Sequence, residues 1–89
     1  MSGRIHWARG GEARVVSIDG DAITLSSSVP SPPGSRIGGT LETPPPTPIR
    51  IKIHASRLTG DGGFELRGRL LDATRDVRSR LEQEVRGGT

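Results

Sequence analysis

The chain has 89 residues, no cysteine and a formal net charge of +3, with Lys52 as its one lysine against 12 arginines. This length suits one small domain, so we expect residues 1–89 to fold as a single unit with a core at about 4–86. The lack of thiols excludes a disulfide scaffold and thiolate chemistry. Two aromatic residues, Trp7 and Phe64, are too few for a broad platform that stacks successive bases.

The first expected strand is RIHWAR, residues 4–9, in which Ile5 and Trp7 share one face. Gly10-Gly11 follows and predicts a turn, because glycine accepts backbone angles that other residues avoid. Further along, VVSIDGDAITLSS, residues 15–27, alternates apolar and polar positions and predicts two strands. We expect Asp19-Gly20 to form the two-residue hairpin link between them. The apolar positions of that pattern are Val16, Ile18, Ile23 and Leu25.

Three more strands are expected in the middle of the chain. RIGGTLE, residues 36–42, predicts a strand interrupted at Gly38-Gly39 by a bulge or a sharp bend. PIRIKIHA, residues 48–55, and FELRGRLL, residues 64–71, predict an antiparallel hairpin with an apolar inner face. Its outer face is basic and carries Arg50, Lys52, Arg67 and Arg69.

From Thr74 onward the apolar period becomes helical, with Val77, Leu81 and Val85 on one stripe. Asp72 or Thr74 can cap this helix, and Gly87-Gly88 can end it. The chain is therefore expected to form five or six short strands followed by one helix. A sheet this small removes its exposed edges most simply by curling into a barrel.

No arrangement of residues points to catalysis, and we expect neither an enzyme nor a metal site. His6 and His54 lack the spacing of metal ligands, and the oxygen ligands of a calcium loop are missing around Asp19 and Asp21. No apolar run reaches the length of a membrane span, and the N-terminal segment lacks the apolar stretch of a signal peptide. A cytoplasmic protein without membrane insertion is the expectation.

The basic outer face admits two interpretations. Arg50, Lys52, Arg67 and Arg69 can attract anions, including the phosphates of a nucleic acid. Charges on a strand face can equally serve to keep that strand from pairing with another chain. We favour the second interpretation, because Glu65 interrupts the face and the net charge is modest.

The order of elements resembles that of a PilZ domain, a small six-stranded antiparallel β-barrel with one C-terminal α-helix that typically serves as a receptor for cyclic di-GMP. The resemblance covers about residues 4–86 and rests on two segments. SIDGDAITLSSSVPSPPGSRI is similar to the family's hairpin and following loop, and FELRGRLLDATRDVRSRLEQEV is similar to its last strand and helix. The resemblance implies a mainly β fold of this type.

The family's ligand signature combines an RxxxR segment with a [DN]xSxxG segment, and this chain departs from both. The second segment aligns with Ser17, Asp19 and Ala22, which replace Asp or Asn, Ser and Gly. The arginines that could serve as the first recur at every fifth residue rather than every fourth; they are Arg4, Arg9 and Arg14. Arginines of this kind grip phosphates through charge-assisted bonds, so their loss weakens nucleotide binding.

Three functions follow as expectations. The first is a noncatalytic adaptor that binds another protein in bacterial cyclic di-GMP-related signalling, at motility, pilus or envelope machinery, with weak or no nucleotide binding and no cofactor. The second is a divergent cyclic di-GMP receptor that uses Arg4, Arg9 or Arg14 with Asp19. The third is a basic barrel that binds nucleic acid.

Overall fold

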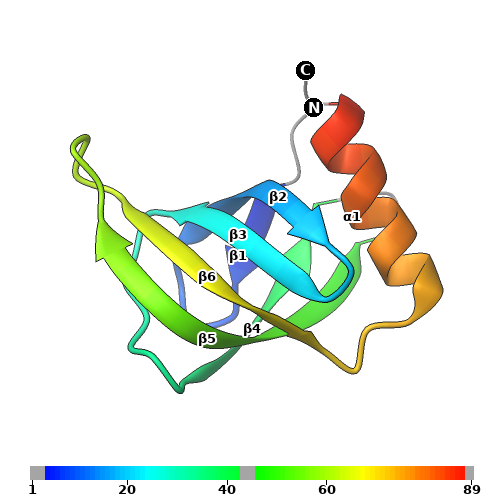
Figure 1. Cartoon of the computed structure of the whole chain (residues 1–89), viewed down its shortest axis with the longest axis horizontal. Helices are drawn as coiled ribbons and strands as arrows, with labels where there is room; N and C mark the ends of the chain where they lie inside the picture. The colour runs from blue at the N-terminus through cyan, green and yellow to red at the C-terminus, as the bar shows by residue number, and fades with distance from the viewer. Residues whose placement is uncertain (1–3, 43–45, 88–89) are drawn as a thin grey trace.

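The chain forms a closed antiparallel β-barrel with one C-terminal helix (Figure 1). The structure is a computed structural model that describes residues 4–42 and 46–87. The strands close in the order β1-β2-β3-β6-β5-β4, which confirms the predicted six-stranded antiparallel barrel. The elements are β1 (Arg4–Trp7), β2 (Glu12–Asp19), β3 (Ala22–Ser27), β4 (Arg36–Leu41), β5 (Thr47–Leu58), β6 (Phe64–Leu71) and α1 (Arg75–Gly87).

Alternating side chains of every strand fill the barrel and leave the intervening ones outside. On β5 the three isoleucines predicted to face inward are buried. Of the basic residues between them, Arg50 is exposed and Lys52 is partly buried. Trp7 is also buried, and its Nε1 donates a hydrogen bond to Ser27 Oγ at 3.1 Å. Ser27 Oγ in turn donates to the carbonyl oxygen of Val29 at 2.7 Å, so the buried polar groups here are satisfied.

The hairpin of β2 and β3 forms as predicted, with two corrections. The register shifts between Val15 and Ser17, so a bulge turns Val15 inward and leaves Val16 54% exposed, against the prediction that Val16 is buried. The link is Gly20-Asp21 rather than Asp19-Gly20, because Asp19 pairs with Ala22. Gly20 has φ +61°, the positive angle that the first central residue of a type II′ turn requires.

Strand β4 runs without the predicted interruption at Gly38-Gly39. It keeps one register with β5 from Arg36 to Leu41 and also pairs with β1. A Cβ on Gly39 would lie 2.7 Å from the carbonyl oxygen of His6, so glycine lets β1 and β4 approach each other. This pairing closes the barrel.

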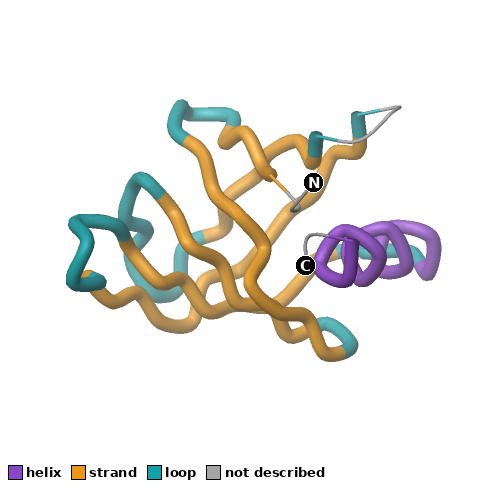
Figure 2. Tube along the Cα trace, turned by 90° about the horizontal axis from the view of Figure 1, so that it is seen from above, coloured by secondary structure: helices purple, strands orange, loops and turns teal. Residues whose placement is uncertain are grey.

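Helix α1 lies against one end of the barrel, near β2 and beyond the end of β6 (Figures 1 and 2). Thr74 caps it, since Thr74 Oγ1 accepts a hydrogen bond from the Val77 N–H at 3.2 Å. Leu81 is fully buried in the core, and Val77 and Val85 pack beside it as predicted. The helix covers the barrel opening next to the turn between β2 and β3.

Two polar contacts fix the orientation of α1. Arg80 Nη1 donates to Thr47 Oγ1 at 3.2 Å and also pairs with Asp76 within the helix at 3.3 Å. Arg78 Nε lies 2.9 Å from Asp21 Oδ1, and both atoms are shielded from solvent. The second contact ties the first turn of the helix to the hairpin link of β2 and β3.

Candidate functional site

The three N-terminal arginines do not converge on one point. Arg4 and Arg14 face each other across β1 and β2, and Arg4 Nε lies 3.8 Å from Glu12 Oε2. Arg9 follows β1 and donates a hydrogen bond from Nη2 to the carbonyl oxygen of Pro30 at 2.8 Å. Arg9 is therefore held against the chain, while Arg4 and Arg14 form a pair.

A surface cavity of about 370 Å³ lies beside that pair. The Glu12 carboxylate shares this cavity with the two arginines and offsets part of their positive charge. The lining residues are Arg4, Glu12, Ala13, Arg14, Ser26, Ser27 and Ser28.

The second part of the expected signature lies at the opposite end of the hairpin. Asp19 and Ala22 are paired next to the link, and Ser17 pairs with Thr24. With a strand rise of about 3.3 Å per residue, roughly 15 Å of β2 separates Arg14 from Asp19. The structure therefore does not bring the arginines together with Ser17, Asp19 and Ala22.

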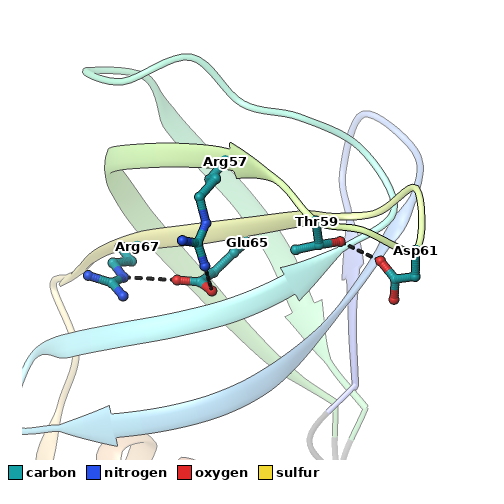
Figure 3. Close-up of polar contacts among 5 residues, drawn as sticks. All are labelled: Arg57, Thr59, Asp61, Glu65 and Arg67. Carbon is teal, nitrogen blue, oxygen red and sulfur yellow. Dashed lines mark hydrogen bonds and ion pairs between the residues drawn. The ribbon is translucent and has the colours of Figure 1, made fainter.

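Carboxylates pair with two of the four residues in the predicted basic patch, and Figure 3 shows one of these pairs, Arg67 with Glu65. Arg67 Nε lies 3.0 Å from Glu65 Oε1, and Arg57 Nη2 lies 2.9 Å from Glu65 Oε2. The hydrogen bond from Arg67, helped by the charge of Arg57, lowers the pKa of Glu65. Arg50 Nη1 lies 3.6 Å from Asp72 Oδ2. Lys52 and Arg69 are the two members of the patch that keep an unbalanced charge.

The tip of the β5–β6 hairpin is ordered by its own side chains (Figure 3). Asp61 Oδ1 accepts hydrogen bonds from the Thr59 hydroxyl and from the Gly63 N–H, the latter at 3.1 Å. These two bonds, that from Thr59 first, lower the pKa of Asp61. The Asp61 carboxylate thus stabilises a turn.

Lys52 and Arg69 belong to a row of three cations that crosses neighbouring strands. Arg36 of β4 lies directly opposite Lys52 of β5, and Lys52 lies directly opposite Arg69 of β6. Side chains opposed in this way have Cβ atoms about 4.5–5.5 Å apart, and like charges there are destabilising. None of the three has a hydrogen bond or ion pair within the described part of the chain. We call Arg36, Lys52 and Arg69 the cationic row.

The cationic row opens into a surface cavity of about 420 Å³. The connection from β6 to α1 and the Asp21–Arg78 pair form its wall toward the helix. Its two carboxylates are both engaged, Asp21 with Arg78 and Asp72 with Arg50. The lining residues are Asp21, Arg36, Lys52, His54, Arg69, Leu70, Leu71, Asp72, Ala73 and Arg78. This cavity is the strongest candidate for an anion site.

Protection of a strand edge does not account for Lys52 and Arg69 of the cationic row. Strand β4 is paired with β1 and β5, and β5 is paired with β4 and β6. Strand β6 is likewise paired on both sides at Arg69, so Lys52 and Arg69 have no free strand edge to protect, whereas Arg36 lies at the end of β4 before its pairing with β1 begins at Gly39. The interpretation that we favoured from the sequence therefore does not explain Lys52 and Arg69.

Sequence reasoning missed Arg36 and Arg78. The outward position of Arg36 follows from the buried Ile37 beside it, but its register against Lys52 depends on the connection between β4 and β5. Arg78 is one of several helix arginines in the sequence, and only the docking of α1 places it beside Asp21. Neither placement leaves a local signal in the sequence.

Among residues 4–42 and 46–87, no three His, Asp or Glu side chains gather as metal ligands do. No helix in that part of the chain is both long enough and apolar enough to cross a bilayer. Comparison with known proteins gives no match to a protein-family model, to a curated protein or to a solved structure.

Proposed function

We propose that this chain is a noncatalytic PilZ-like adaptor of a bacterial cytoplasm that acts in cyclic di-GMP-related signalling by contact with another protein. The observation that supports the proposal is the cationic row, which lies on an outer face and has no carboxylate partner in the described part of the chain. An acidic surface on a partner would relieve the repulsion within the row and place a complementary charge against it. Motility, pilus and envelope machinery are the proposed settings.

Weak or absent nucleotide binding is part of the proposal. Arg9 is held by Pro30, Arg4 lies near Glu12, and Asp19 is remote from both. Each lost charge-assisted hydrogen bond removes about 1.5–3 kcal/mol, so two losses weaken binding by about a hundredfold or more.

The test is crosslinking from two positions of the same strand. A photoreactive residue at Ala22, which lies opposite Arg69, should crosslink a partner protein in cells. The same residue at Ser26, an exposed position of β3 opposite Arg14, is the matched control. The crosslink at 22 should disappear when the cationic row is changed to glutamine. Equal crosslinks at both positions, or a crosslink at 22 that persists in the glutamine variant, would contradict the proposal.

A divergent cyclic di-GMP receptor is the second candidate, favoured by the pairing of Arg4 with Arg14 beside a cavity. An NMR titration with cyclic di-GMP separates the two candidates. The adaptor predicts no shift at residues 4–24 with millimolar nucleotide. A saturable shift that is lost in Arg14→Ala would establish the receptor instead.

A further inference from the structure

We infer that the cavity above the cationic row is a binding site for a small ligand that carries a diphosphate group. This inference deepens the proposed function and rests on it in one respect, namely that the same outer face makes the functional contact. The juxtaposition that carries it is Arg36, Lys52 and Arg69 in one lateral register beneath a cavity of about 420 Å³.

The charge of the cavity fits a multiply charged anion. Its two carboxylates are matched by Arg78 and Arg50, so the cationic row keeps its positive charge. Lys52 is partly buried at the centre of the row, and Arg36 and Arg69 flank it on the two neighbouring strands. A single phosphodiester carries one negative charge, whereas a diphosphate can balance most of the row.

The types of donor also fit phosphate. Two guanidinium groups offer planar forks that bind phosphate oxygens in pairs, and the lysine ammonium offers three donors between them. Adjacent strands lie about 4.8 Å apart, so the three side chains approach from separate directions an anion centred over β5. Phosphate oxygens accept from several directions, while a carboxylate presents only two oxygens.

The size and surroundings of the cavity favour a small molecule. A volume of about 420 Å³ lies within the range of about 300–1,000 Å³ that is typical of small-molecule sites. Leu71 and Ala73, which are partly exposed, line the side next to the helix and offer apolar contact beyond the phosphates. His54, which is exposed, also lines the cavity and adds a further hydrogen-bonding group.

The experiment is a titration of the purified chain with pyrophosphate, followed by NMR and by calorimetry at constant ionic strength. We expect saturable binding with shifts at Arg36, Lys52 and Arg69. Lys52→Gln and Arg69→Gln should each weaken binding by about tenfold or more, because each removes a charge-assisted contact. Arg57→Gln is the matched control, because Arg57 is an exposed strand arginine of β5 that pairs with Glu65 and lies outside the cavity, and this variant should bind as the wild type does.

Several outcomes would overturn the inference. One is the absence of saturation at millimolar pyrophosphate, and another is equal weakening in Arg57→Gln. A single-stranded oligonucleotide that binds with steep salt dependence and that pyrophosphate cannot displace would assign the face to nucleic acid instead. A circular dichroism spectrum of each variant is the control that the barrel is still folded. If pyrophosphate does not bind but the crosslink at position 22 forms in the wild type and is lost in the glutamine variant, the adaptor proposal still stands.

Discussion

Glu65 shows how a single carboxylate reduces the net positive charge of the basic face. It receives Arg67 and Arg57 on its two oxygens, and its pKa is lowered by these contacts. A lowered pKa in the folded chain means that Glu65 contributes stability above its unfolded pKa, about 4.3. That contribution is lost as the pH falls through the folded value.

We therefore predict that Glu65→Gln lowers the melting temperature slightly at neutral pH, because two arginines lose their counterion. The difference from the wild type should shrink as the pH is lowered through the acid range, where Glu65 itself becomes protonated. Thermal unfolding followed by circular dichroism between neutral and acid pH measures it. Glu82→Gln is the control, since Glu82 is an exposed helix carboxylate without an ion pair in the described part of the chain. A difference that does not change with pH would contradict the prediction.

At the scale of the element, Thr74 marks the start of α1, close to residues that line the 420 Å³ cavity. Its hydroxyl accepts the Val77 N–H, and its neighbours Ala73 and Arg78 line the cavity. Asp72, the alternative cap, instead has φ +52° and pairs with Arg50. The cap thus fixes where the helix begins and how Arg78 meets Asp21.

Thr74→Ala should lower the free energy of unfolding by about 0.5–2 kcal/mol, the usual cost of a lost N-cap. Urea unfolding monitored by circular dichroism gives this value. Ser79→Ala, at an exposed position in the middle of the same helix, is the control and should be neutral or slightly stabilising. An equal loss in both variants would show that the capping bond does not form.

The elements themselves are readable from the sequence, because alternation reports directly which side chains a barrel buries. Ile49, Ile51 and Ile53 show this, and Leu81 shows the same for the helix. The bulge near Val16 is not readable, since adjacent valines fit either phase of the strand and the choice depends on pairing with β3. The role of Gly39 is not readable for a related reason. A glycine that permits close approach of two strands and a glycine that interrupts a strand look alike in sequence.

The candidate site was harder to predict than the fold. Lys52 and Arg69 follow from alternation, but which basic residues keep a free charge depends on long-range partners. Arg67 meets a carboxylate on its own strand, whereas Arg50 meets one beyond the end of β6. Cross-strand register, which joins Arg36 to Lys52, comes from closure of the whole barrel.

At the scale of the whole molecule, closure of the barrel places positive charges side by side on neighbouring strands. Two of these cations, Lys52 and Arg69, have a paired strand on each side. The chain carries a net charge of +3, and its unbalanced cations include three side by side on β4, β5 and β6. Like charges at opposed positions lower the free energy of unfolding, and salt screens them. The stability of the folded chain should therefore depend on ionic strength in a way that can be traced to Lys52.

Replacing the central cation tests this directly. Lys52→Glu converts two repulsions into two attractions and should raise the free energy of unfolding by about 0.2–1 kcal/mol for each pair at low salt. Glutamine and glutamate side chains have nearly the same size. The difference in the free energy of unfolding between Lys52→Gln and Lys52→Glu therefore isolates the effect of the charge. Arg67→Glu, on the same face but beside Glu65, should have the opposite sign and lower stability. Urea unfolding at low and high salt measures all three, and a Lys52→Glu variant that is destabilised at low salt would show that the row does not hold its cations close together.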